Sequence, residues 1–428
     1  MKQESFDVLI VGAGPAGVAA ALAAARSGAR VGVVDASPTP GGQIWRGGAA
    51  HSHDPQSRRW LPRLDAAPGV RVLCQTKVVA PLDPYALLAE TPAGAVELRY
   101  AAAVLATGAR ERFLPFPGWT LPGVLGAGGL QALVKGGLSV AGKRVVVAGS
   151  GPLLLAVASF LRERGAQVPV VAEQAPLRKL LPFGALLAGL APAKLAQAAA
   201  YAPAGAALRP GCWPLAAAGQ VWVEQVTLAQ GEKTWDVPCD YLACGFGLVP
   251  NLELASALGC ALADGVAQVD VWQRTSIAHI YAAGEITGVG GVDQALAEGQ
   301  IAGYAATGNR AAAQAHFAQR AQAHRFRQAL EFTYALRPEL AALAQPDTVV
   351  CRCEDVAYRD LARHTSWRSA KLHTRCGMGP CQGRVCGAAT GYLFGWGQDS
   401  VRPPIATAQV ATFASLSTLE SHTQELHP

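Results

Sequence analysis

The chain has 428 residues, of which 15% are charged, and a formal net charge of +6. This length exceeds what one simple core needs and predicts two or three domains. The small positive charge comes from scattered arginines that never alternate with aromatic residues along a strand, which argues against a nucleic-acid-binding surface.

The opening residues, MKQESFDVLIVGAGPAG, enter a strand pattern at once, so we expect no signal peptide. The apolar run GALLAGLAPAKLAQAAA is interrupted by Pro192 and Lys194. It falls short of the roughly 20 apolar residues that a membrane-spanning helix needs. We therefore expect a soluble, cytoplasmic protein. Cysteines crowded into one tail of such a protein indicate metal binding rather than disulfides.

The first predicted unit is a βαβ motif that ends at Asp35. Its expected parts are a buried strand over 7–11, a GxGxxG turn, a helix that runs to residue 26, and a second strand over 30–34. Strand, glycines, helix, strand and acid in this register are typical of a dinucleotide-binding site.

Each residue type in this motif has a physical reason. The first glycine permits the tight turn, the second lets the backbone approach a pyrophosphate, and the third lets the helix pack on the strand. The positive end of the helix dipole then faces the phosphates, and the acid accepts hydrogen bonds from a ribose. The predicted binding residues are Gly12, Gly14, Pro15, Ala16, Gly17, Asp35 and Ala36.

Three further stretches indicate that this dinucleotide is FAD, because they resemble motifs of flavoproteins with two dinucleotide-binding domains. They are TPGGQIW, AAAVLATGARER and TSIAHIYAAGEITGVGGVDQALAEGQIAG. Glu285 stands where these flavoproteins more often have aspartate, and we expect its carboxylate to face the ribityl chain. The helix from about Gln294 is expected to point its N-terminus at the flavin. These stretches add the site residues Gly42, Gln43, Ala106, Thr107, Gly108, Gly284 and Glu285.

A second βαβ pattern, KRVVVAGSGPLLLAVASFLRERGAQVPVVAEQ, follows. Gly149 and Gly151 match the first two glycines, Leu154 replaces the third, and Glu173 takes the place of the acid. Two interpretations stay open. Either these residues form an NAD(H) site in which Glu173 disfavours NADP, or the Rossmann fold is structural or holds another nucleotide. The stretch over 239–255 is expected to return the chain to the FAD domain.

The sequence lacks the redox cysteine pair of disulfide reductases. GGQIWRGG contains no cysteine, and none lies between Cys74 and Cys212. Cys239 and Cys244 flank a predicted strand and are expected to be buried and inert. We therefore predict that the FAD is not coupled to a dithiol and that its electrons take another route.

Five of the ten cysteines lie between residues 351 and 386. They form a CxC pair, Cys351 and Cys353, followed by Cys376, Cys381 and Cys386. The glycines of GMGPCQG are suited to pointing backbone N–H groups at sulfur, which tunes an iron–sulfur cluster. Zinc is the alternative, but zinc sites of four cysteines mostly use two CxxC knuckles, and neither half here is CxxC.

This tail resembles the small [2Fe–2S] domain of bacterioferritin-associated ferredoxin (BFD), and more closely the version fused to flavoprotein dehydrogenases, where the second pair reads GMGPCQGxxC. The resemblance implies the ligands Cys351, Cys353, Cys381 and Cys386, with Cys376 as the spare thiol. An alternative set, in which Cys376 and Cys381 form the second pair, has the same spacing and stays open.

Nearly the whole chain resembles one family, the FAD/[2Fe–2S] α subunit of heteromeric amino-acid dehydrogenases. That family includes opine oxidases, hydroxyproline and proline dehydrogenases, and hydrogen cyanide synthase. The stretch ATGARERFLPFPGWTLPGV resembles a motif that is characteristic of this family. The resemblance implies a partner β subunit of the D-amino-acid oxidase type that oxidises the amine, a third small subunit in some assemblies, and in some members an FMN between subunits. The α subunit itself passes electrons onward.

The expected fold is therefore α/β, with two Rossmann-like domains and a C-terminal BFD-like [2Fe–2S] domain. The expected boundaries are 1–118 with 245–325 for the FAD domain, 119–244 for the second domain, and 345–428 for the cluster domain. Three functions compete. The first is an electron-transfer subunit, with no catalytic residue for amine oxidation of its own. The second is a self-contained NADH-dependent reductase, and the third is a scaffold whose cofactors only stabilise a complex.

Overall fold

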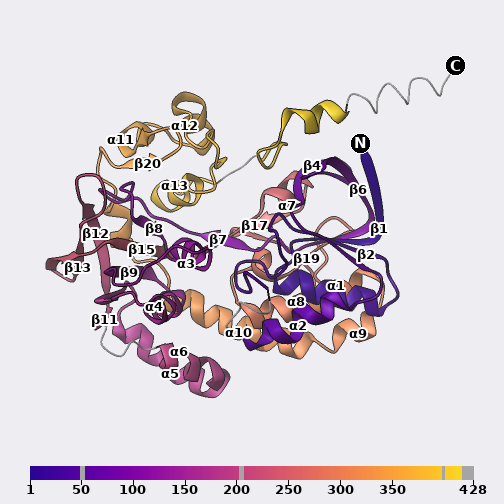
Figure 1. Cartoon of the computed structure of the whole chain (residues 1–428), viewed down its shortest axis with the longest axis horizontal. Helices are drawn as coiled ribbons and strands as arrows, with labels where there is room; N and C mark the ends of the chain where they lie inside the picture. Colours follow the sequence, from indigo (N-terminus) through magenta and orange to yellow (C-terminus); the bar gives the residue numbers. More distant parts are fainter. Residues whose placement is uncertain (49–53, 202–206, 398–400, 417–428) are drawn as a thin grey trace. The chain divides into compact units, whose positions relative to one another are not determined.

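A computed structural model describes residues 1–48, 54–201, 207–397 and 401–416 of the chain (Figure 1). The chain forms two compact units. Unit 1 comprises Met1–Arg110, Pro250–Arg327 and the described part of Ser400–Pro428. Unit 2 comprises Glu111–Val249 and the described part of Gln328–Asp399.

Unit 1 is built on a 7-stranded sheet in the order β3-β2-β1-β6-β5-β4, with β19 (Ile280–Ala282) also paired to β6. Strands β1, β2, β3, β6 and β19 run parallel to their partners within this group, whereas β4, β5 and the first half of β6 form an antiparallel meander. The elements before the first crossing are β1 (Lys2–Val11), α1 (Pro15–Arg26), β2 (Val31–Val34), α2 (Pro55–Asp65), β3 (Val70–Leu73), β4 (Lys77–Asp83), β5 (Ala86–Thr91) and β6 (Gly94–Leu105).

Two helices of unit 1, α1 and α8 (Val292–Ala306), lie side by side, and both belong to the core that covers the parallel strands (Figure 1). Gly299 and Gly303 of α8 allow this approach, because a Cβ at either would lie 2.2 Å from a backbone oxygen of α1. The second part of unit 1 contains α7 (Glu253–Ala257), β17 (Leu262–Ala263), β18 (Val266–Ala267), β19 (Ile280–Ala282), the 3-10 helix η1 (Gly284–Thr287), α8 (Val292–Ala306) and α9 (Arg310–Gln314).

Unit 2 contains a 5-stranded parallel sheet in the order β11-β10-β9-β15-β8 and a 3-stranded antiparallel sheet, β12-β13-β14. Its elements up to the second crossing are β8 (Val124–Gly126), α3 (Ala127–Lys135), β9 (Val145–Ser150), α4 (Leu153–Glu163), β10 (Val170–Glu173), α5 (Leu177–Leu190), α6 (Pro192–Tyr201), β11 (Ala207–Pro210), β12 (Cys212–Ala218), β13 (Gln225–Gln230), β14 (Lys233–Pro238) and β15 (Tyr241–Phe246). Three elements contain unit boundaries or adjoin them: β7 (Ala109–Glu111), β16 (Leu248–Pro250) and α10 (Phe317–Thr333).

The cysteine-rich tail belongs to unit 2. Its elements are short: η2 (Pro338–Ala342), β20 (Val349–Cys351), β21 (Val356–Ala357), α11 (Tyr358–Leu361), α12 (Trp367–Thr374) and α13 (Cys386–Phe394). A small core of its own holds them, and Leu340 and Leu343 pack into the core of the second Rossmann sheet.

The division of the chain differs from the expected one at the C-terminus. Residues 345–428 do not form one body, because the chain after residue 400 returns to the meander of unit 1. Ile405 N–H donates to the carbonyl oxygen of Val79, and the Gln409 amide and Thr412 hydroxyl both donate to Glu90. No spacing signal in the sequence marked this return, since it depends on pairing with residues more than 300 positions earlier.

Candidate functional site

The first glycine turn is as tight as the motif requires. Gly12 has φ 108°, and a Cβ there would lie 2.2 Å from the carbonyl oxygen of Ala106, just after the end of β6. A Cβ on Gly17 would lie 1.8 Å from the carbonyl oxygen of Gly12. The backbone of the turn therefore contacts the ATG stretch at Gly12 and the start of α1 at Gly17. Only glycine fits at these two positions.

Asp35 and the second glycine turn complete this cradle. One carboxylate oxygen of Asp35 accepts a 2.7 Å hydrogen bond from Ala13 N–H, and the other accepts one of the same length from Ser37 N–H. Gly41 N–H donates to the carbonyl oxygen of Ala13, and a Cβ on Gly42 would lie 2.9 Å from the Cα of Gly14. The structure thus brings together the predicted residues of the TPGGQ and GxGxxG stretches.

Thr107 of the ATG stretch is paired with the chain that returns to unit 1. Its hydroxyl donates to the carbonyl oxygen of Asn251 at 2.7 Å, and the Asn251 side chain donates to the carbonyl oxygen of Thr107 at 2.8 Å. Gly108 accepts from the Asn251 N–H. This exchange fixes the backbone that follows β6 next to the glycine turn.

Glu285 lies in η1, one residue after Gly284. Its Oε1 accepts a 2.8 Å hydrogen bond from Gly291 N–H at the start of α8, while its Oε2 is buried and has no protein partner among the described residues. Burial raises the pKa of Glu285 to about 7. An acceptor that is buried and unpartnered at this position suits a ligand hydroxyl, as the sequence predicted for the ribityl chain.

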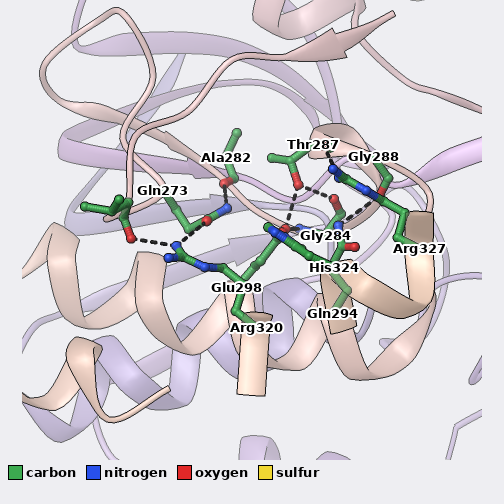
Figure 2. A network of polar contacts seen from close by, with 11 residues as sticks. Gln273, Ala282, Gly284, Thr287, Gly288, Gln294, Glu298, Arg320, His324 and Arg327 are labelled. Atoms are coloured by element: carbon green, nitrogen blue, oxygen red, sulfur yellow. Dashed lines mark hydrogen bonds and ion pairs between the residues drawn. The ribbon is translucent and has the colours of Figure 1, made fainter. Parts of the chain in front are cut away.

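A polar network behind η1 holds this turn in place (Figure 2). Glu298 of α8, fully buried, accepts from Gly284 N–H at 2.9 Å and from the Thr287 hydroxyl at 2.6 Å. His324 Nε2 lies 2.8 Å from the other oxygen of Glu298, and Arg327 donates to the carbonyl oxygen of Thr287. Helix α10 therefore fastens the turn that carries Glu285.

Sequence reasoning missed Glu298, His324 and Arg327. The available signal was Glu298, a charged residue in the middle of an alanine-rich helix and four positions after Gln294, which donates to the carbonyl oxygen of Gly288. A charge on a buried helix face is rarely left unpaired. Its partners could not be found in the same way, because they lie on another helix.

The residues of unit 1 fit FAD on these observations. Glycines whose Cβ positions are filled by backbone line the turn, α1 begins there with Pro15, and Glu285 presents an unpartnered oxygen. The amide groups at the start of α1 supply the donors that a pyrophosphate needs.

The second glycine turn, in unit 2, is built differently. Gly149 is sterically required, because a Cβ there would lie 1.8 Å from the carbonyl oxygen of Gly245 in the neighbouring strand β15. A Cβ on Gly151 would meet nothing within 4 Å. Leu154 is buried in the core between α4 and the sheet. The leucine therefore packs the helix against the sheet without narrowing the turn itself.

Glu173 is committed to the protein's own backbone. One of its oxygens accepts from Gly151 N–H and the other from Ala175 N–H, both at 2.8 Å. Only 5% of the residue is exposed, and burial raises its pKa to about 7. The amide of Gly151, which a nucleotide would approach, already has an acceptor.

The segment after α10 lies against the second turn. The Ser150 hydroxyl donates to the carbonyl oxygen of Tyr334 at 3.1 Å, and the fully buried Gln174 amide donates to Ser150 and faces the carbonyl oxygens of Tyr334 and Ala335. Gln174 also accepts from Arg337 N–H. We call residues 334–337 the strap. The side chains of Ser150, in the turn, and Gln174, just after β10, are therefore hydrogen-bonded to the strap.

The cysteines of the tail converge. The sulfur atoms of Cys351, Cys376 and Cys386 lie within 4.8 Å of one another, and all three residues are buried. Cys353, which is exposed, and Cys381, half-buried, adjoin them, because the Cys386 and Cys353 thiols donate hydrogen bonds to Cys381. Cys376, expected to be the spare thiol, is therefore part of the same group of sulfur atoms.

Backbone amides point into this group, as the glycines suggested. Gly377 and Glu354 donate to Cys351, and Gly383 and Val385 donate to Cys381. The neighbouring thiols and these amides lower the pKa of Cys351 to about 2 and that of Cys381 to about 5. The backbone is close as well, since a Cβ on Gly379 would lie 2.3 Å from the Cβ of Cys353. This sulfur-rich donor set fits an iron–sulfur cluster or another thiophilic metal.

The remaining cysteines of unit 2 are inert, as predicted for Cys239 and Cys244. Both are buried, as is Cys212. Burial raises the pKa of the Cys212 thiol to about 11 and that of Cys239 to about 12, and it also raises the pKa of Cys244. A thiol that stays protonated is neither a nucleophile nor a dithiol redox partner.

Within the described ranges, no helix combines the length and the apolar character that crossing a membrane requires.

Comparison with known proteins gives consistent matches. The pyridine nucleotide-disulphide oxidoreductase family matches residues 6–315. An opine oxidase subunit of Agrobacterium tumefaciens (strain Ach5) is 32% identical, over 95% of this chain and 88% of that protein. The hydrogen cyanide synthase subunit HcnB of Pseudomonas aeruginosa is 32% identical, over 88% of this chain and 90% of that protein.

Solved structures agree on the fold. L-proline dehydrogenase from P. horikoshii has a TM-score of 0.69 and 19% identity, and the match covers 96% of this chain and 80% of that one. Thioredoxin reductase of T. acidophilum has a TM-score of 0.53 and 20% identity, covering 71% of this chain and 98% of that one. The chain therefore belongs to the pyridine nucleotide-disulphide oxidoreductase family, in the group that includes HcnB and the matched opine oxidase subunit, and is a flavin-dependent oxidoreductase.

Proposed function

We propose that the chain is the FAD- and [2Fe–2S]-containing electron-transfer subunit of a hetero-oligomeric dehydrogenase. The substrate would be an amino-acid-derived amine of the opine, hydroxyproline or proline type, oxidised in a partner flavoprotein subunit of the D-amino-acid oxidase type. The observation that carries this proposal is the convergence of five cysteines on one site in a flavoprotein whose other described thiols offer no redox pair.

The proposed cofactors divide the work. A bound flavin takes electrons in pairs and releases them singly, and a [2Fe–2S] cluster carries one at a time. The residues of unit 1 would bind and orient the FAD: Gly12, Gly14 and Gly17 at the pyrophosphate, Asp35 at the ribose, and Glu285 at the ribityl chain. The network around Glu298 would keep Glu285 in position. An FMN between subunits remains part of the proposal for the assembly.

The proposed cluster ligands are Cys351, Cys353, Cys381 and Cys386. Amides that donate to Cys351 and Cys381 stabilise the anionic sulfur atoms that such a ligand set needs. Cys376 lies against this set and is the competing fourth ligand.

The state of the second glycine turn favours a partner subunit over NADH as the source of electrons. Glu173, like Asp35, accepts from two backbone amides, but one of the two is the amide of the second glycine, Gly151, which a nucleotide would approach. Ser150 and Gln174 are occupied by the strap. A nucleotide that used Ser150 or Gln174 would have to break these hydrogen bonds.

An anaerobic titration of the purified chain tests the proposal. NADH should leave the flavin absorbance unchanged, whereas dithionite should bleach the flavin and produce the electron paramagnetic resonance (EPR) signal of a reduced [2Fe–2S] cluster. Bleaching by NADH followed by cluster reduction would overturn the proposal in favour of the self-contained reductase.

Iron and sulfide analysis of cysteine variants tests the ligand set. Cys353→Ser, Cys381→Ser and Cys386→Ser should each lower the cluster content, whereas Cys376→Ser should leave it unchanged. Cys244→Ser, at a buried cysteine outside the group, is the matched control. Loss of the cluster in Cys376→Ser with retention in Cys386→Ser would assign the competing ligand set.

A further inference from the structure

One aromatic residue of unit 2 makes two contacts with the CxC loop. Trp119, in the turn between β7 and β8, is 3% exposed. Its indole N–H donates a 2.5 Å hydrogen bond to the carbonyl oxygen of Val349, two residues before Cys351. The guanidinium of Arg352, between the two cysteines of the pair, lies 5.4 Å from the centre of the Trp119 ring.

We propose that Trp119 is a positioning residue for the cluster site: its N–H anchors the strand that carries Cys351, and its ring holds the guanidinium of Arg352, the residue between the two cysteines of the CxC pair. This inference rests on the proposed [2Fe–2S] centre and extends it to a residue more than 200 positions earlier in the chain.

Burial makes the anchor effective. The Trp119 ring packs in the core of the Rossmann sheet and lies 4.9 Å from the Phe113 ring, so the indole cannot follow the loop if the loop moves. An indole N–H buried in such a core needs an acceptor, and Val349 supplies it. The loop that carries the CxC pair is held by the pairing of β20 with β21, by Val350 and Cys351 in the small core, and by Arg375, which donates to Glu354. Trp119 adds an anchor from the larger core.

The cation has a predictable electrical effect. Reduction adds one negative charge to a cluster held by thiolates, so a nearby positive charge stabilises the reduced form and raises the reduction potential. Arg352 is exposed. Without the aromatic face, its long side chain would spread into water, where solvent and salt screen it. Losing the ring should therefore lower the potential of the cluster.

Four single variants of the full chain test this: Trp119→Leu, Trp119→Phe, Arg352→Gln and Trp213→Phe. Trp213 is the matched control, because it lies in the same core, is 6% exposed and also carries an arginine over its ring, Arg337 at 4.0 Å. The readouts are iron and sulfide content, the EPR spectrum of the dithionite-reduced chain, and the cluster's reduction potential from a dye-mediated titration.

We expect Trp119→Leu and Arg352→Gln to lower the ratio of reduced to oxidised cluster about 3- to 10-fold at a fixed potential, where tenfold corresponds to about 59 mV. The double variant Trp119→Leu/Arg352→Gln should shift the reduction potential no further than either single variant, because both changes remove the same interaction. Trp119→Phe should lower the reduction potential less, and Trp213→Phe should leave it unchanged. Equal shifts in Trp119→Phe and Trp213→Phe, or additive shifts in the double variant, would overturn the proposal.

A second measurement separates this inference from the proposed function. In the metal-free chain, hydrogen exchange of the amides over 349–357 should become faster in Trp119→Phe and stay unchanged in Trp213→Phe. If the chain takes up no cluster but this difference is seen, the proposed function fails and the anchoring of the loop stands. If neither variant changes the exchange, the anchoring is wrong.

Discussion

The two βαβ motifs of this chain share a topology and differ in how their turns are used. In unit 1 the Cβ positions of Gly12 and Gly17 are filled by neighbouring backbone, and Asp35 is half-buried and bound to the Ala13 amide. In unit 2 the third glycine is a leucine, and Glu173 is buried and bound to the Gly151 amide. One extra methylene allows the glutamate to reach the amide one position further along the turn than the aspartate does.

The comparison teaches that two Rossmann motifs of one chain can share a fold and differ in which turn amide their acid occupies. Both motifs bury a strand, a turn and a helix in their cores. The difference lies in polar atoms: the turn of unit 1 has an unpartnered carboxylate oxygen near it, on Glu285, whereas the side chains at the turn of unit 2 are bound to one another and to the strap.

The largest expected effect comes from the difference in space around the glycines of the two turns. Gly17→Ala places a Cβ against the carbonyl oxygen of Gly12 and should lower the free energy of unfolding by more than about 4 kcal/mol, with loss of FAD. Gly151→Ala meets no neighbour and should cost about 1–3 kcal/mol through its positive φ alone, with FAD retained. Urea unfolding and the flavin content after gel filtration measure both effects. Equal losses of stability and of flavin in the two variants would contradict the proposed difference between the two turns.

A smaller effect concerns pH. Burial raises the pKa of both Glu173 and Glu285 to about 7, from an ordinary value of 4.5. The folded chain therefore binds more protons than the unfolded chain over this window. The stability that protonation contributes is present below about pH 4.5 and is lost as pH rises through about 7. At about 1.4 kcal/mol per pKa unit, each group contributes on the order of 3 kcal/mol to this fall.

Urea unfolding between pH 5 and 8 measures this dependence. Glu173→Gln and Glu285→Gln should each flatten the fall in stability, and the double variant should remove most of it. A side-chain amide keeps one acceptor oxygen, so each variant also loses part of a hydrogen bond at every pH. A slope unchanged in both variants would contradict the buried, proton-binding state of these carboxyl groups.

The smallest expected effect concerns the hydrogen bonds between the second glycine turn and the strap. Ser150→Ala removes the hydroxyl that donates to Tyr334 and accepts from Gln174 and should cost about 1 kcal/mol. Ser159→Ala, on the exposed side of α4, should cost less than about 0.5 kcal/mol and serves as the control. NADH should bleach the flavin in neither variant, because Glu173 still holds the turn. Bleaching in Ser150→Ala alone would show that the strap is what excludes the nucleotide.

The sequence by itself determined the parts of the molecule that depend on short-range spacing. Gly12, Gly17 and Asp35 lie in one motif in which chain geometry fixes the distances, and the structure places them as that geometry requires. The burial of Cys239 and Cys244 also followed from a local pattern, because one precedes and the other lies in an apolar central strand that is buried on both faces. The family resemblance rested on the same local motifs.

Tertiary structure decided what depends on contacts between distant residues. It placed Cys376 with Cys351 and Cys386, seated the strap on the second turn, and set Glu298 between Gly284 and His324. It also returned the chain after residue 400 to unit 1 and bound Trp119 to Val349. None of these contacts has a spacing rule, because a hydrogen bond or a shared core constrains two positions in space and leaves their separation along the chain free.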